Sequence, residues 1–193
     1  SVTMDIQDVP AIVAAARSRG VPVALDNTYS AGVLFDAFRH GVDVSVQALT
    51  KYVGGHSDLL LGSVSVARAA LYEKVGAVWA LLGMAVSPDD ASLALRGLQT
   101  MGVRLDRLQA STLKVATWLK GRPEVDTVLH PAFADCPGHE FWKRDFSGSS
   151  SVFSFVFGRG VAAGQVAGFV DNLTLFQKGF SWGGTASLAM IYP

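Results

Sequence analysis

The chain has 193 residues, enough for one large domain or for one domain and part of another. Its 16 basic and 16 acidic residues cancel to a formal net charge of zero, which argues against nucleic acid or an anionic membrane as a partner. Half of the residues are hydrophobic and only 17% are charged, which excludes a disordered chain, and no apolar stretch approaches the roughly 20 residues of a membrane span.

The first third of the chain predicts a sheet whose strands are joined by helices or turns. Asp8 followed by Pro10 predicts the start of a helix that continues through the Ala-rich stretch 11–17, and strands are expected over 21–25, 42–47 and 59–66. The first strand is an apolar run that ends abruptly in polar residues, as in a buried parallel strand. The second alternates valines with polar residues and closes at Thr50 and Lys51. This arrangement favours an α/β fold.

The remainder begins with a long helix and continues in a different order. Ser87 and Pro88 predict the start of this helix and Gly121 its end, while Gly97 and Gly102 predict a bend within it. Strands over 125–129 and 152–157, helices over 140–144 and 165–172, and an extended stretch from 173 follow. Because the order changes, we expect a domain boundary inside the long helix, between residues 97 and 105, that divides 1–100 from 101–193.

Lys51 stands out as a candidate nucleophile because of its apolar surroundings. It is the only formally charged residue among the 14 that lie between Asp43 and Asp58, and the flexible pair Gly54-Gly55 follows it. A solvated lysine just after a strand is the simpler interpretation. A lysine held among apolar neighbours, however, loses proton affinity and can attack a carbonyl.

Asp26 is the second candidate, although a helix cap or turn residue would look the same in the sequence. It ends one predicted strand and Lys51 ends the next, with 24 residues between them. In a parallel sheet both side chains therefore lie at the carboxyl edge, where open α/β sheets bind ligands. An amine that forms a Schiff base and a carboxylate that keeps a ring nitrogen protonated are what a pyridoxal 5'-phosphate site needs.

Three stretches carry a resemblance to a known family. LDNTYSAGVLF, VSVQALTKYVGGHSD and GFSWGGTASL resemble the Cys/Met-metabolism family of pyridoxal-phosphate enzymes, which have the aspartate-aminotransferase type of fold. The resemblance covers essentially the whole chain, and SWGG at 181–184 is most similar to the bacterial cystathionine β-lyases. It implies that 1–100 is the C-terminal part of the cofactor-binding large domain and 101–193 the N-terminal part of the smaller α+β domain.

The resemblance also implies roles for individual residues. Lys51 would be the lysine that binds the cofactor and then moves protons, Asp26 would pair with the pyridine nitrogen, and Thr50 would offer its hydroxyl to the phosphate. Ser181 and Trp182 would line the place of the substrate amino acid. No metal is implied.

The chain departs from the family pattern at two positions and lacks three of its features. Ala48 stands where many relatives have a serine that binds the phosphate, and Thr185 stands where a larger residue is usual. The family's stacking aromatic, its Gly-rich phosphate turn and its arginine for the substrate carboxylate are absent from these 193 residues. The chain therefore holds only part of the family's active site.

The implied reaction is the α,β-elimination of L-cystathionine to homocysteine, pyruvate and ammonia, a step of methionine biosynthesis. The alternatives are a γ-lyase or γ-synthase, and a catalytically incomplete fragment of the β-lyase.

The resemblance also implies an assembly, because the family usually forms homotetramers. The lone Cys136 predicts a reducing, cytoplasmic location. Because neither end of the sequence carries a start signal, a cap or a polar tail, we expect an internal piece of a longer protein. Its apolar excess would lie on surfaces that missing segments or partner subunits cover.

Overall fold

The computed structural model describes residues 2–192 and confirms the α/β class. The elements in chain order are α1 (Val9–Arg17), β1 (Ala24–Asp26), β2 (Val44–Ala48), β3 (Gly62–Val66), α2 (Ala69–Leu81), α3 (Pro88–Lys120), β4 (Val125–Leu129), α4 (His139–Asp145), β5 (Ser154–Phe157), α5 (Ala163–Asp171), β6 (Gln177–Lys178) and β7 (Leu188–Ala189). The three predicted strands of the first third are all present, each shorter than expected or shifted by a few residues.

Side-chain caps fix where the two best-predicted helices begin. Asp8 accepts a hydrogen bond from the backbone N–H of Ala11 at 3.3 Å at the start of α1. At the start of α3, the Ser87 hydroxyl accepts from the backbone N–H of Asp90 at 3.0 Å. Each bond satisfies an N–H that has no partner inside its helix, so both predicted starts are confirmed.

The first sheet has the order β1-β2-β3. β1 runs parallel to β2 with Asp26 opposite Val46, whereas β3 runs antiparallel to β2. The expectation of a buried first strand was wrong, because Ala24 and Asp26 are exposed. Only one face of this sheet is covered. Leu25 packs against the core formed with α1, while Val46 and the paired Val64 lie open on the other side.

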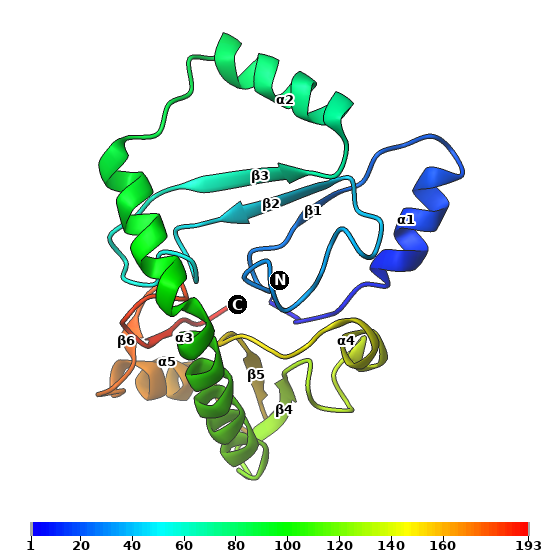
Figure 1. Cartoon of the computed structure of the whole chain (residues 1–193). Coiled ribbons are helices and arrows are strands. Elements are labelled where there is room, and N and C mark those ends of the chain that lie inside the picture. Colours follow the sequence, from blue (N-terminus) through cyan, green and yellow to red (C-terminus); the bar gives the residue numbers. More distant parts are fainter. Residues whose placement is uncertain (1, 193) are drawn as a thin grey trace.

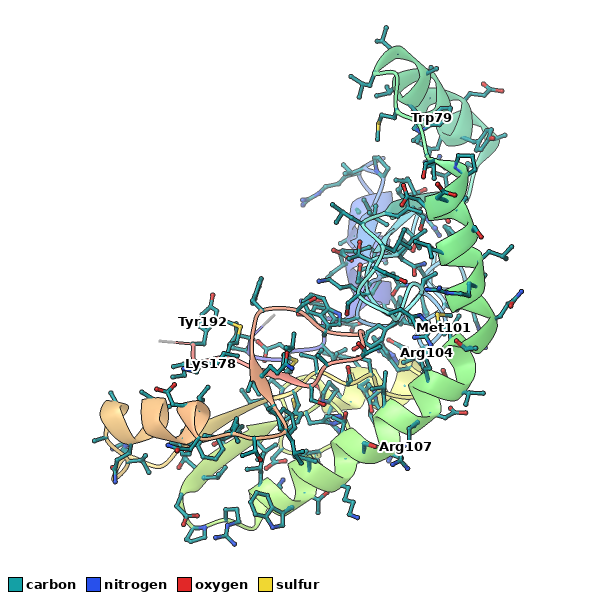
Figure 2. The ribbon with its side chains drawn as sticks, turned by 90° about the vertical axis from the view of Figure 1, so that its left-hand side faces the viewer. Trp79, Met101, Arg104, Arg107, Lys178 and Tyr192 are labelled. Atoms are coloured by element: carbon teal, nitrogen blue, oxygen red, sulfur yellow. The ribbon has the colours of Figure 1, made fainter. Side chains whose placement is uncertain are left out.

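The long helix α3 connects the two halves of the chain. Figure 1 shows it running from beside the three-stranded sheet down to the β4–β5 pair. Met101 and Leu105 pack into a core cluster with Tyr52, and Ala116 packs into a second cluster with Val128. α3 is one continuous helix, and Figure 2 shows it changing direction near Met101 and Arg104, close to where the two glycines predict a bend. The boundary between residues 97 and 105 stays a prediction. No helix among the described residues is both long and apolar enough to span a membrane.

Candidate functional site

Lys51 lies in a tight turn directly after β2. The backbone N–H of Gly54 donates to the Leu49 carbonyl at 2.7 Å, and that of Gly55 donates to the Lys51 carbonyl at 2.8 Å. We call residues 49–55 the Lys51 turn. Tyr52 and the three residues after it are buried, whereas the Lys51 side chain is half-buried. The lysine therefore projects from a buried, hydrogen-bonded turn and is itself partly exposed.

The Lys51 amine is held by residues from the far end of the chain. Its Nζ donates a hydrogen bond to the Ser181 hydroxyl at 2.9 Å and lies 4.3 Å from the centre of the Trp182 ring. A cation over the face of an indole is attracted by the ring's electron density. The sequence predicted all three as site residues, and the structure brings them together across 130 positions.

A glycine allows this approach. Gly183 has a φ of +78°, and a Cβ there would lie 2.9 Å from the backbone of Lys51 and of Tyr52. That separation is shorter than real Cβ contacts allow, and the positive φ disfavours other residue types. The SWGG segment can lie on the Lys51 turn only because this position has no side chain.

Trp182 stacks on an aromatic residue that the sequence analysis missed. Its ring lies parallel to that of Tyr29, with centroids 4.8 Å apart and an angle of 6° between the planes. Burial, aided by the nearby Tyr52 and the Asp26 carboxylate, raises the pKa of Tyr29. The indole Nε1 of Trp182 is buried and has no hydrogen-bond partner among the described residues. The position of Tyr29, three residues after Asp26, is the signal that could have identified it.

Asp26 ends β1 and lies at the same sheet edge as the Lys51 turn, because β1 and β2 are parallel. One carboxylate oxygen accepts the backbone N–H of Thr28 at 3.0 Å. Asp26 also lines a hollow of about 310 Å³, together with Asn27 and Tyr29 but without Lys51. Asp26 and the Lys51 turn therefore lie at the same edge of the sheet. Tyr29 lines the hollow beside Asp26, and its ring stacks on the ring of Trp182, over which the Lys51 amine lies.

Thr50 and Thr28 form backbone contacts at this edge. The Thr50 hydroxyl donates to the carbonyl of Leu61 at 3.2 Å and accepts the N–H of the same residue at 3.0 Å. It would have to release its carbonyl partner to donate to a phosphate. The Thr28 hydroxyl accepts the backbone N–H of Ala48 at 2.9 Å and so joins the ends of β1 and β2. Among residues 2–192, no group of three or more His, Cys, Asp or Glu side chains could hold a metal.

Comparisons with known proteins add to this geometry. The model of one family, described as Cys/Met metabolism PLP-dependent enzyme, matches residues 1–192. The chain is 48% identical over 192 residues to a cystathionine beta-lyase of Haemophilus influenzae and 49% identical over 193 residues to the cystathionine beta-lyase MetC of Escherichia coli. Each alignment covers 98% of this chain and 48% of the relative, so the chain spans about half the length of these curated relatives.

A solved structure shows the same fold. A cystathionine gamma synthase from Xanthomonas oryzae matches with a TM-score of 0.92 and 33% identity, over 96% of this chain and 48% of that one. The structural match therefore extends over nearly the whole of this chain.

Proposed function

Because the chain belongs to the Cys/Met metabolism family of PLP-dependent enzymes, we propose that the protein is a carbon–sulfur lyase that catalyses the α,β-elimination of cystathionine. The observation that carries the proposal is the Lys51 amine, which Ser181 and Trp182 hold at the sheet edge that also bears Asp26. The named relatives with 48–49% identity support β-elimination.

The residues at this edge fit pyridoxal phosphate in their chemistry. Lys51 offers a primary amine for covalent attachment, and Asp26, which lines a hollow, offers a carboxylate. The unpartnered Nε1 of Trp182 is a buried donor that still needs an acceptor. When bound, the cofactor supplies a ring that takes up the electrons of the broken C–H bond. Thr50 is the weakest part of the fit, because its hydroxyl is already bonded to Leu61.

The roles of the side chains follow from their positions. Lys51 Nζ would take the proton from the substrate α-carbon, a step that a positioned base accelerates by about 10² to 10⁴. The Ser181 hydroxyl, which accepts a hydrogen bond from Nζ, would fix the direction of that transfer. Asp26 would hold the proton on the pyridine nitrogen. Trp182 and Tyr29 form an apolar wall that would exclude water and pack against the substrate chain.

Two alternatives have specific support. The solved neighbour with a TM-score of 0.92 is a gamma synthase, so γ-chemistry on the same fold is the second candidate. The third candidate is that the 193 residues are catalytically incomplete, since they span about half of each relative.

We also propose that the protein forms a homotetramer in the cytoplasm. Exposed apolar side chains such as Tyr72 and Leu81 of α2 support assembly, and the lone Cys136 supports a reducing compartment.

The test measures the products and the labelled lysine. The protein, supplied with pyridoxal phosphate and cystathionine, should release pyruvate, whereas 2-oxobutyrate would indicate γ-elimination. Borohydride should trap the cofactor on the peptide that contains Lys51. Lys51→Ala should abolish the label and lower the rate by at least about a hundredfold. Lys114→Ala, an exposed lysine of α3, is the matched control and should change neither.

The outcomes separate the three candidates. Label on Lys51 with no product from the 193-residue chain would favour the catalytically incomplete fragment. A label on another lysine, or none at all, would contradict the proposed site. Formation of 2-oxobutyrate without pyruvate would replace the β-lyase by the γ-lyase.

A further inference from the structure

One partly buried cation, Arg104, joins α3 to the Lys51 turn. The guanidinium of Arg104 donates to the carbonyl oxygen of Tyr52 at 2.7 Å and to that of Val53 at 3.3 Å. It also donates to the carbonyl of Gly97 at 2.7 Å and, through Nε, to the Thr100 hydroxyl at 3.1 Å. Four of its five N–H groups are thus used, and every acceptor is neutral.

This arrangement is unusual for a surface arginine. We call Arg104 together with its four hydrogen bonds to Tyr52, Val53, Gly97 and Thr100 the clamp. None of the ion pairs formed by the described residues includes Arg104. Burial lowers the pKa of Arg104, yet an arginine keeps its charge in proteins. Hydrogen bonds from a charged donor are about twice as strong as those between neutral groups. The two carbonyls of the Lys51 turn lie outside any helix or strand, and Arg104 supplies the donors that a backbone ladder would otherwise provide.

Two glycines make room for the clamp. A Cβ at Gly97 of α3 would overlap the carbonyl oxygens of Val53 and Gly54, so α3 touches the turn with its backbone. A Cβ at Gly55, where φ is +72°, would overlap the Arg104 guanidinium. Figure 2 shows Arg104 where α3 meets the rest of the chain. Helix, turn and arginine therefore fit together only with glycine at both positions.

We propose that Arg104 is the positioning residue of Lys51. By tying the Tyr52 and Val53 carbonyls to α3, it fixes the base from which the Lys51 side chain reaches Ser181 and Trp182. Where it concerns reaction with the cofactor, this role rests on the proposed function. The mechanical part, a turn that moves as one unit with α3, stands on the contacts alone.

The first measurement needs no cofactor. In the unmodified protein, hydrogen exchange should show the amides of Gly54 and Gly55 protected as strongly as those of Met101 and Leu105. Arg104→Gln should accelerate exchange in the Lys51 turn about tenfold or more, because it removes charged hydrogen bonds to two carbonyls. Arg107→Gln, an exposed arginine one turn further along α3, should leave exchange unchanged.

The second measurement separates positioning from general stability. The equilibrium constant for covalent attachment of pyridoxal phosphate to Lys51, followed by absorbance and by borohydride trapping, should fall about tenfold in Arg104→Gln. Arg104→Lys keeps the charge without the planar fork and should recover part of the loss. Arg107→Gln should match the unmodified protein in both attachment and melting temperature.

The outcomes distinguish this proposal from the proposed function. If the unmodified protein does not attach the cofactor at Lys51, the proposed function fails. Hydrogen exchange still tests whether Arg104 fixes the Lys51 turn to α3. Attachment and exchange that are the same in Arg104→Gln as in the unmodified protein would overturn the clamp alone. If Arg104→Gln does not fold, Arg104→Lys decides, and unaltered exchange and attachment in that variant would contradict the proposal.

Discussion

The Lys51 turn and helix α2 differ sharply in how they are packed, although both follow strands of the same sheet. The turn meets α3 and the SWGG segment at distances that leave no room for a Cβ at Gly97 or Gly183. Helix α2 has no buried residue, and its Tyr72 and Leu81 are 71% and 85% exposed. The contacts that position Lys51 thus lie within this chain, while α2 presents an apolar surface that the described residues do not cover.

The largest effect should come from the side chain that fills the space beneath the turn. Met101 is 6% exposed and packs with Tyr52 and Leu105. Met101→Ala should lower the free energy of unfolding by about 2 to 5 kcal/mol, because it leaves a cavity that packed neighbours cannot close. Urea unfolding measures it, and Leu98→Ala, at a position 51% exposed on the same helix, is the control. Equal losses in the two variants would contradict this account of the packing.

A buried histidine predicts sensitivity to acid. His130 is 1% exposed, and burial lowers its pKa from 6.5 to about 4. Between these two values the unfolded chain binds a proton that the folded chain does not, so stability falls as the pH falls. The loss should reach about 3 kcal/mol at pH 4 relative to pH 7.

Unfolding measured across this pH range tests the role of His130. His130→Asn should remove most of this slope even if it lowers stability at pH 7. A slope that persists in His130→Asn would assign the acid sensitivity to other groups.

Two glycines of α3 give a direct test of the close approach between this helix and the Lys51 turn. Gly97→Ala should cost about 2 kcal/mol, because its Cβ would overlap backbone oxygens that cannot rotate away. Gly102→Ala meets nothing within 4 Å and should stabilise by up to about 1 kcal/mol through helix propensity. Opposite signs for the same substitution, read from melting temperatures, would confirm that α3 touches the turn. Two stabilising variants would refute it.

The sequence predicted what depends on local signals and on pairs of strand ends. Ser87 and Asp8 mark helix starts by their own chemistry, and Asp26 with Lys51 follows from parallel pairing of neighbouring strands. The resemblance identified Ser181 and Trp182, which no local pattern would have linked to a lysine 130 positions earlier.

Contacts between distant segments escaped prediction for a physical reason. Arg104 appears in the sequence as one more polar residue of a helix, and its function depends on carbonyls that the fold brings to it. Gly97 was interpreted as a weak point where α3 bends, and the sequence did not reveal that it also lets the helix backbone touch the Lys51 turn. The exposure of β1 was missed because an apolar run does not reveal which of its faces is covered within the chain.

The smallest effect on folding should come from helix α2, the loosely packed region. Trp79 of α2 is 49% exposed, and Figure 2 shows it far from Met101 and the body of the structure. Trp79→Ala should change the free energy of unfolding of the monomeric chain by no more than about 0.5 kcal/mol, since little apolar area leaves contact. If α2 is also an assembly surface, the same variant should weaken self-association in sedimentation experiments, while the stability of the monomer stays constant. A large loss of monomer stability would show that α2 is packed within the chain, and the contrast with the Lys51 turn would then disappear.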